Sequence, residues 1–424
     1  MNVDSPATGI VRNRLGATSS MNSIVSQCAP QRWLRVGKYL LPLGMKTVGW
    51  RPTKPPRVQV RVAQLATDHP DRVVLHSAGK AEVLPEFEYE SAESGVSEPH
   101  VLPTKFVAPA FVAEIRNGAS FGRHCCVIGP EGKAVRETGF NLDGEVLSAR
   151  KPIRRFRLQY WRKRWEGDVT SRPWLPPKLH VEGRVAVLNT RFSHNFYHWM
   201  IDVLPRLMPL RRAGTEADYY LVDCLSPFQR NVLAALGIES RQLIQPHCRL
   251  LLEADQLLVP SFPTAACLRE FGSTLLRGLG ADGVVRSPRR IFISRRNTGT
   301  RTLANEDQLE KLLQAHEFET HSMERYTLAK QARLIREAEI IVATHGAGLA
   351  NLVFARPNTR IIEIVPAGRY NFTIYPEKSR IFGLEHHILF AASARHKQIL
   401  HVVLDDVAAA LDWAERPAYR AIAA

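Results

Sequence analysis

Residues 194–206 read His-Asn-Phe-Tyr-His-Trp-Met-Ile-Asp-Val-Leu-Pro-Arg, an apolar run interrupted by side chains that can move protons. At the helical spacing of about 100° per residue, His194, His198 and Asp202 fall on one face. Any one of them could be a core residue with a structural hydrogen bond, but three on one face favour a site. Because Pro205 has no backbone donor, we expect the helix to kink or end there.

Alternating strands and helices extend from this region to the end of the chain. Predicted strands of a first series are Arg184–Leu188, Tyr219–Val222, Leu250–Leu252 and Gln256–Val259, with helices His194–Arg212, Pro227–Leu236 and Ala265–Leu279. A second series has strands Arg290–Ser294, Ile340–Ala343, Arg360–Val365 and Leu400–Leu404, with helices Glu306–His316, Leu328–Glu337, Ala347–Phe354 and Val407–Glu415. Such alternation is typical of parallel sheets with right-handed crossovers. We therefore predict an α/β protein with two Rossmann-like domains facing a cleft, at residues 181–284 and 285–424.

The first 180 residues differ in character. Residues 1–56 are rich in Ser, Gly, Pro and Arg with little periodicity, and we expect a disordered basic leader. Residues 57–180 contain short apolar runs separated by turn residues, which predicts a β-rich N-terminal elaboration followed by a linker. Within it, Glu82–Glu98 contains six Glu and no Lys or Arg, and we interpret it as a solvated loop.

Charge and cysteine content limit the function classes. Two windows, residues 1–60 and 150–172, carry +8 and +7 of the net charge of +16, so a basic leader and linker explain the excess and nucleic acid is not expected as a partner. The six cysteines form no Cys-x-x-Cys pair and no disulfide framework, which favours a reducing, cytoplasmic compartment. No apolar run is long enough to span a membrane. Gln31–Gly49 could instead be a basic amphipathic segment, giving peripheral association with the cytoplasmic face of the inner membrane.

Two loops of the second series carry residues suited to anions. Arg295, Arg296 and Arg301 follow a predicted strand, and arginine binds phosphate through paired donors. Residues 344–348, Thr-His-Gly-Ala-Gly, follow the next strand and open a helix whose backbone donors a phosphate could approach. Glu363 could accept hydrogen bonds from ribose hydroxyls or be an ordinary strand residue. The predicted donor-binding residues are Arg295, Arg296, Arg301, His345, Gly346, Ala347, Gly348, Asn351 and Glu363.

Three blocks of sequence resemble the signature blocks of glycosyltransferase family 61. They are His194–Trp199 with Asp202–Arg206, Ile293–Arg296 with Arg301 and Asn305–Asp307, and His345–Asn351. The resemblance spans Val185–Pro366 and implies a GT-B fold, inversion at the anomeric carbon, and a nucleotide-sugar donor, usually UDP-linked, held without a metal site. The resemblance does not identify the substrate; we expect a glycan or lipid-linked glycan acceptor, as in capsule or other cell-surface polysaccharide synthesis. Residues 1–180 lie outside the resemblance.

An inverting transfer requires a base that deprotonates the acceptor hydroxyl. Asp202 is the preferred base and His198 the next, with His194 the third candidate; Asp202 and His198 could also orient one another. Asn305 and Glu306 could equally begin the following helix. We expect no metal and no cofactor beyond the nucleotide sugar. One alternative is a metal-dependent hydrolase that uses His194, His198 and Asp202 as ligands, and another is a non-catalytic protein that binds nucleotide or carbohydrate.

Overall fold

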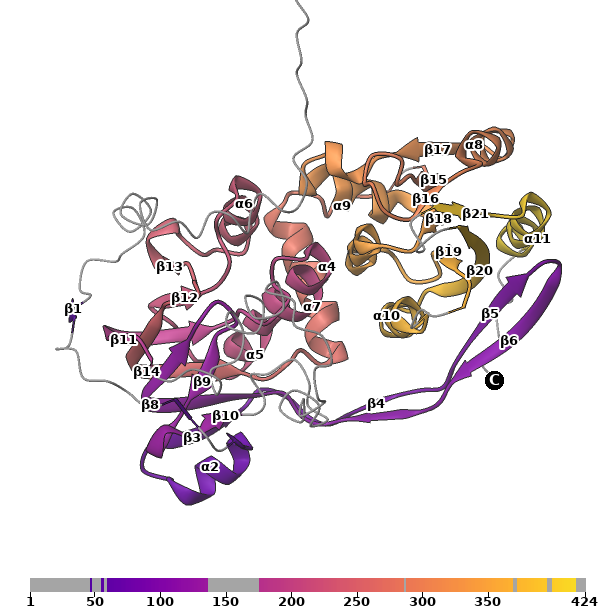
Figure 1. Ribbon diagram of the computed structural model, residues 1–424. Helices are drawn as coiled ribbons and strands as arrows, with labels where there is room; N and C mark the ends of the chain where they lie inside the picture. The colour runs from indigo at the N-terminus through magenta and orange to yellow at the C-terminus, as the bar shows by residue number, and fades with distance from the viewer. Residues whose placement is uncertain are drawn as a thin grey trace, which may run out of the picture. The chain divides into compact units, whose positions relative to one another are not determined.

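The computed structural model describes residues 46–47, 55–56, 59–135, 175–285, 287–368, 372–394 and 399–416, all within one compact unit, Pro42–Ala424. These residues form a mixed α/β protein whose two large sheets contain both parallel and antiparallel pairs (Figure 1). The α/β class is therefore confirmed, whereas a GT-B arrangement with two domains facing a cleft stays a prediction. The predicted basic leader, the amphipathic segment Gln31–Gly49 and the linker at 150–172 lie almost wholly outside the described residues.

The first sheet has the strand order β13-β12-β11-β14-β8-β9-β10-β2. Its parallel half consists of β11 (Lys178–Val187), β12 (Tyr219–Leu221), β13 (Leu243–Ile244) and β14 (Leu251–Pro260). Two predicted strands, Leu250–Leu252 and Gln256–Val259, are thus one strand, which continues through the exposed Asp255 although its pairing with β11 shifts register there. The rest of the sheet is β1 (Lys46–Thr47), β2 (Gln59–Val60), β3 (Val73–Ser77), β8 (Phe111–Phe121), β9 (Cys126–Ile128) and β10 (Ala134–Val135).

The second sheet has the order β16-β21-β20-β19-β18-β15-β17. Its strands are β15 (Arg289–Ile293), β16 (Thr302–Leu303), β17 (Phe318–His321), β18 (Ala338–Thr344), β19 (Arg360–Pro366), β20 (Glu385–Ala394) and β21 (Ile399–His401). Strands β16, β17 and β20 were not predicted from the sequence. Leu400–Leu404 was predicted as a strand of the parallel series, but β21 runs antiparallel to β20.

Helices of both halves share one apolar core. Its members include buried residues of α7 (Ala265–Gly278), of the 3₁₀ helix η10 (Ala347–Phe354) and of α10 (Ile374–Phe382). Gly272 allows α7 to pack closely against η10, because a Cβ there would lie 2.3 Å from the carbonyl oxygen of Val353. The remaining helices are α2 (Val62–Asp68), α6 (Pro227–Ala235), α8 (Glu306–Ala315), α9 (Leu328–Glu337), α11 (Leu404–Glu415) and the single turns Pro130–Gly132, Ser240–Gln242 and Met323–Arg325.

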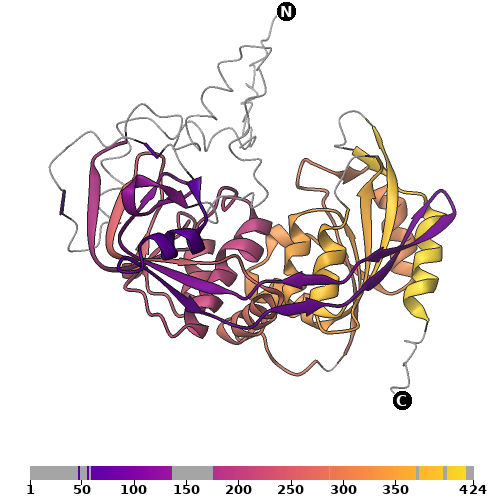
Figure 2. The same ribbon diagram turned by 90° about the horizontal axis from the view of Figure 1, so that it is seen from below.

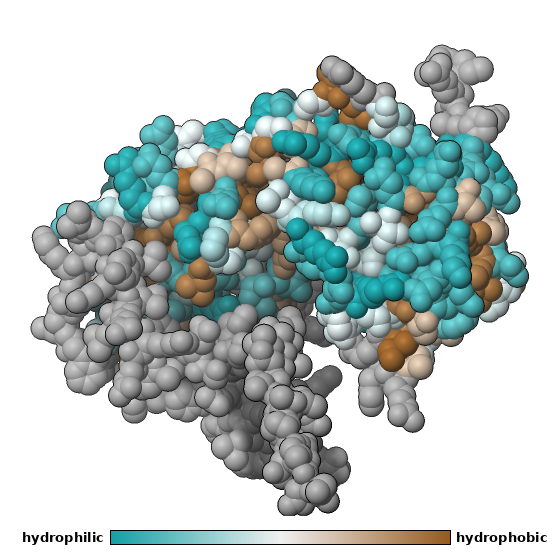
Figure 3. All heavy atoms as spheres, turned by 90° about the horizontal axis from the view of Figure 1, so that it is seen from above, coloured by the Kyte–Doolittle hydropathy of each residue, from teal (hydrophilic) through white to brown (hydrophobic). Residues whose placement is uncertain are grey.

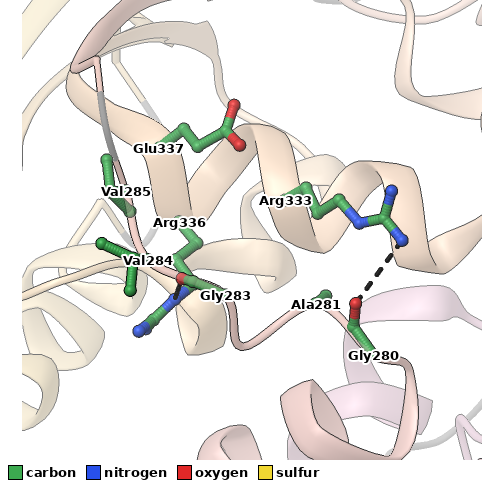
Figure 4. A pocket seen from close by; sticks show the side chains of 8 residues that line it. All are labelled: Gly280, Ala281, Gly283, Val284, Val285, Arg333, Arg336 and Glu337. Carbon is green, nitrogen blue, oxygen red and sulfur yellow. Dashed lines mark hydrogen bonds between the residues drawn. The ribbon is translucent and has the colours of Figure 1, made fainter.

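Residues 280–285, between α7 and β15, run along α9. Arg333 of α9 donates to the carbonyl of Gly280, and Arg336 donates to that of Gly283, both at 3.5 Å (Figure 4). A small pocket lies between this connection and the helix. None of the residues predicted for the site lines that pocket, so the pocket is not part of the candidate site.

A long hairpin, here called the arm, comprises residues 82–107. It contains β4 (Glu82–Leu84), β5 (Phe87–Glu93), β6 (Val96–Leu102) and β7 (Lys105–Val107), and β5 pairs in parallel with β20 (Figures 1 and 2). The prediction of a solvated loop at Glu82–Glu98 is therefore wrong. In β5 the glutamates alternate with buried side chains such as Tyr89 and Ser91. Because β5 pairs with β20, the arm links the N-terminal strands to the second sheet.

No helix in the described ranges is both long and apolar enough to cross a membrane. Hydrophilic side chains cover most of the described surface visible in Figure 3, and hydrophobic ones occur there in separate patches. Several of the large hydrophobic side chains that are exposed belong to the arm: Val83, Val96, Val101 and Phe106.

The tip of the arm generates a prediction about stability. Ser94 and Gly95 form the two-residue turn, both with positive φ, and their backbone N–H groups donate to the carboxylate of Asp406 at 3.0 and 2.7 Å. Because Asp406 is buried, Asp406→Ala should lower the free energy of unfolding by about 1.5–3 kcal/mol. Asp405→Ala is the matched control, since Asp405 lies exposed in the same helical turn. Equal effects of the two substitutions in urea unfolding would contradict this role for Asp406.

Candidate functional site

The helix predicted over His194–Arg212 is present but irregular. Asn195 caps it by accepting a hydrogen bond from the N–H of Tyr197 at 2.9 Å, so His194 lies before the helix begins. One short α-helical stretch, α4 (Phe196–His198), leads into a π-helical segment, Trp199–Val203, then a 3₁₀ turn, Leu204–Arg206, and α5 (Leu207–Arg212). The missing donor of Pro205 explains why a regular helical ladder does not pass through this point. The predicted three-residue stripe is therefore reduced to two residues on the helix.

His198 and Asp202 form that pair. Nδ1 of His198 lies 2.7 Å from Oδ2 of Asp202, and both side chains remain about one-fifth exposed. The rings of Phe192 and Tyr197 contact the imidazole, with centroids 5.1 and 5.2 Å away. The carboxylate can therefore fix the orientation of an imidazole that is only partly shielded from solvent.

Arg206, the last residue of the same motif, has a structural position. It is fully buried and donates to the carbonyls of Leu188, at 3.1 Å, and Pro260, which end β11 and β14. Burial lowers its pKa to about 10, and these backbone acceptors satisfy the charged group. Arg206 thus ties the helix to the carboxyl ends of two parallel strands.

A second set of predicted residues gathers at the carboxyl ends of β18 and β19. Nδ1 of His345 lies 2.5 Å from one carboxylate oxygen of Glu363, and Nε2 of His386 lies 3.1 Å from the other. Glu363 is completely buried. Burial alone would raise its pKa, but the hydrogen bonds from His345 and His386 outweigh burial and lower it. Glu363 therefore orients His345, and direct contact with a ribose stays a prediction.

The predicted arginines point in different directions. Arg295 donates to the backbone and side-chain oxygens of Thr300, at 3.2 and 3.1 Å, and its guanidinium occupies the space beside Gly346, where a Cβ would lie 2.0 Å from Nη1. Arg301 has a positive φ of 56°. Arg296 instead bonds Asp307 at 2.7 Å and Glu310 at 3.1 Å on α8. Arg295 thus belongs with the glycine turn, whereas the contacts of Arg296 are those of a residue that anchors its loop.

The other predicted residues of this half divide in the same way. Ala347 and Gly348 are half-buried in the first turn of η10. Asn351 is buried and donates to Gln331 at 2.8 Å inside the helical layer. Asn305 bonds both backbone groups of Val402, and the buried Glu306 accepts from Ser294. For Asn351, Asn305 and Glu306 the structure thus provides internal partners.

Helix α10, which the sequence analysis missed, brings the two sets of residues together. Tyr375 contacts Tyr197 at a ring distance of 5.7 Å and His345 at 5.3 Å, and its hydroxyl donates to the carbonyl of Gly346 at 2.5 Å. Burial raises the pKa of Tyr375 well above its ordinary value, and the charges of Arg301 and Arg295 oppose that rise. The His198 side of the site and the Gly346 turn are thus joined through one aromatic side chain.

Lys378, one turn further along α10, was also missed. It is half-buried, and burial lowers its pKa while the carboxylates of Asp202 and Glu377 act in the opposite direction. A positive charge therefore lies within electrostatic reach of the His198–Asp202 pair. Pro376 in the first turn and Gly383, left-handed at the end of the helix, are the sequence signals that could have located α10.

The buried carboxylate gives a prediction of pH dependence. Since the pKa of Glu363 is lower in the folded protein than its ordinary value of 4.5, the carboxylate stabilises the fold above that value, and this stabilisation is lost as the pH falls through the folded pKa. Glu363→Gln should lower the free energy of unfolding at pH 7 by about 1–3 kcal/mol and flatten its fall below pH 5. Glu385→Gln, at a half-exposed ion pair with Arg360, is the control and should change stability by less than about 1 kcal/mol. An unchanged acid limb in Glu363→Gln would show that the carboxylate does not stabilise the fold.

Comparison with known proteins agrees with the motifs. A family model described as glycosyltransferase 61 matches residues 196–362. A xylan glycosyltransferase of Arabidopsis thaliana is 32% identical over 94 residues, which are 21% of this chain and 19% of the relative. A beta-1,2-xylosyltransferase of the same organism is 37% identical over 71 residues, which are 16% of this chain and 13% of the relative. The chain thus spans less than a fifth of the length of either relative. Together with the motifs and their placement, the family match shows that this chain carries a glycosyltransferase 61 domain.

Proposed function

We propose that the chain is an inverting glycosyltransferase that moves a sugar from a UDP-linked donor to a glycan acceptor. The observation that carries the proposal is the chain of contacts from the His198–Asp202 pair through Tyr197 and Tyr375 to the Gly346 turn. It joins a candidate base to a candidate phosphate site. Both relatives named above act, by their names, on xylan or with xylose, which supports a glycan acceptor. The proposed setting is synthesis of capsule or another cell-surface polysaccharide on a glycan or lipid-linked glycan, in the cytoplasm or at the cytoplasmic face of the inner membrane.

The donor diphosphate would lie against the Gly346 turn. Arg295 is already held beside this turn by hydrogen bonds to Thr300, and the charge of Arg301 acts on Tyr375, which bonds the turn. An arginine fixed before the ligand arrives loses less conformational freedom on binding and can offer paired donors to phosphate. These groups would neutralise the departing diphosphate in the position that a metal ion takes in other transferases.

The His198–Asp202 pair would act as the base. The acceptor oxygen forms a bond with the anomeric carbon while the bond from that carbon to the diphosphate breaks, and the diphosphate leaves with the electron pair. The acceptor proton passes to the pair, in which Asp202 either holds His198 in one orientation or takes the proton itself. Attack opposite to the leaving group inverts the anomeric carbon.

The alternative of a metal-dependent hydrolase has less support. Among the described residues, no three His, Cys, Asp or Glu side chains are grouped closely enough to hold a metal ion, and His194 does not join His198 and Asp202 in such a set. A non-catalytic binding protein would have no need for the partly exposed His198–Asp202 pair. Donor turnover that starts when an acceptor is added would exclude that second alternative.

Substitutions of the pair should separate chemistry from binding. Asp202→Asn and His198→Ala should keep UDP binding and lower single-turnover transfer by about 10²- to 10⁴-fold, because each disables the proton acceptor. Imidazole should restore part of the activity of His198→Ala if His198 is the base, and formate that of Asp202→Ala if Asp202 is. His316→Ala is the control, since His316 pairs with Glu415 in the same manner at the end of α8. Transfer at the parent rate by folded Asp202→Asn and His198→Ala would remove the pair from the mechanism.

The glycine turn gives a test of the donor site. Gly346→Ala should displace the guanidinium of Arg295 and weaken UDP binding by about 10- to 100-fold, the effect of losing a charge-assisted hydrogen bond. Gly348→Ala is the matched control, because a Cβ there would meet only Ile293 at an ordinary 3.7 Å. Calorimetric titration with UDP measures both. If the two variants bind UDP equally well, Arg295 is not a donor ligand.

Metal dependence is a further test. With arginines and a helix terminus beside the diphosphate, EDTA should leave the transfer rate within about twofold of its starting value. The measurement is the steady-state rate before and after dialysis against EDTA. Loss of activity that manganese restores would contradict a metal-independent donor site.

A further inference from the structure

Two arginines of the first sheet lie near the start of α4. Arg123 is in the turn between β8 and β9, and its carbonyl accepts from the side chain of Asn189 at 2.9 Å. Arg191 follows β11, two residues after Asn189, and is exposed. Both guanidinium charges act on His124. The contacts therefore bring two positive charges from distant parts of the sequence to one place.

This place adjoins the candidate base. The guanidinium carbon of Arg191 lies 5.3 Å from the ring centroid of Phe192, whose ring in turn lies 5.1 Å from that of His198. The charge of Arg123 acts on His194, and His194 itself lies within electrostatic reach of His124 and His198. A ligand group bound by the arginines would thus sit beside the His198–Asp202 pair.

Acidic side chains do not neutralise the two arginines. Across the described ranges, neither Arg123 nor Arg191 forms an ion pair, although Arg289, Arg290, Arg296, Arg360 and Arg380 all do. Asp223 is the acid whose charge reaches His124 and His194. It is buried, and its two oxygens accept from Ser193 at 2.6 Å and Gln245 at 2.7 Å. One buried carboxylate satisfied by neutral donors leaves the group with excess positive charge.

The histidines of the group add little to this charge at neutral pH. Burial, followed by the charges of Arg191 and Arg123, lowers the pKa of His124 to about 4. Burial and Arg123 also lower the pKa of His194. The positive charge therefore comes from the arginines, and the neutral imidazoles can donate or accept hydrogen bonds.

We propose that Arg123 and Arg191, with His194 beside them, form a subsite for a negatively charged group on the acceptor. This inference rests on the proposed function. The group is a carboxylate, as in a uronic acid residue, or a phosphate, as in a lipid-linked glycan, since arginine binds both through paired donors. Both arginines lie in loops of the first sheet, in the half that also contains the candidate base, whereas Arg295 lies beside Gly346 in the second half and the charge of Arg301 acts on Tyr375 there. For this reason the anion belongs to the acceptor and not to the donor diphosphate.

The test uses the full chain saturated with UDP and an array of acidic glycans. Each uronate glycan is paired with its carboxyl-reduced counterpart, and each phosphorylated glycan with its dephosphorylated one. The parent protein should retain acidic members over their neutral counterparts, and the uronate and phosphate pairs show which anion it prefers. The double variant Arg123→Gln/Arg191→Gln should bind the retained glycans about 10- to 100-fold more weakly while its UDP affinity stays within about twofold. Arg116→Gln, at an exposed arginine of β8, is the control and should change neither.

Several outcomes would overturn the inference. They are equal retention of acidic and neutral members, no retention of any acidic member, or unchanged glycan binding by the double variant. A fall in UDP affinity of the double variant would assign the arginines to the donor diphosphate and so overturn it as well. Absence of UDP binding by the parent protein would contradict the proposed function, whereas UDP binding without acidic preference contradicts the subsite alone.

Discussion

The packing of Tyr375 against both Tyr197 and His345 is the contact on which the site depends. Its hydroxyl holds the carbonyl of Gly346, and its ring meets the residue next to His198. Neither half of the predicted site includes α10, yet both are placed by it. The same helix holds Lys378 near Asp202, and Arg380, which donates to the carbonyl of Pro103 in the arm at 2.8 Å. The helix thus connects the candidate base, the glycine turn and the arm.

Buried charges fix the geometry around this helix. Glu363 binds His345 and His386, and His386 in turn contacts Ser379 of α10 at 2.8 Å. Removing one member of such a network leaves a buried polar group without its partner, which costs more than the bond itself contributes. Arg206 has the equivalent position in the first half, where it binds the ends of two strands. Rigid support of this kind keeps the partly exposed pair His198 and Asp202 in one arrangement.

Much of the fold could be predicted because parallel strands are buried on both faces and appear as continuous apolar runs. The strands that contain Val342 and Ile362 are of this kind. The arm could not be recognised in the same way, since its six glutamates outweighed the alternation of Tyr89 and Ser91 with charged residues. Its inward face is covered because a strand about 300 residues away in the sequence lies beside it, and local sequence carries no information on such pairing.

The motif residues of the candidate site were identified from the sequence, but the different contacts that each of them makes were not. His198 and Asp202 form a hydrogen bond, in agreement with the prediction that they could orient one another. His194 lies before the helix, because the cap at Asn195 sets where the helix begins. Helical periodicity alone does not mark that point. In the second half, an arginine that faces Gly346 and one that faces Asp307 look alike in sequence. Only the course of the loop between Arg295 and Arg301 determines which residue each arginine faces.

The central claim is that the Gly346 turn and the His198–Asp202 pair belong to one site. The most direct measurement is the NMR spectrum of the protein with ¹⁵N-labelled histidine, recorded while UDP is added to saturation. Binding at the turn should shift the imidazole resonances of His345 and, through Tyr375 and Tyr197, those of His198. His76, which pairs with Glu114 between β3 and β8, should stay unchanged as the internal control. Shifts at His345 with His198 unmoved, or shifts at neither, would contradict the account.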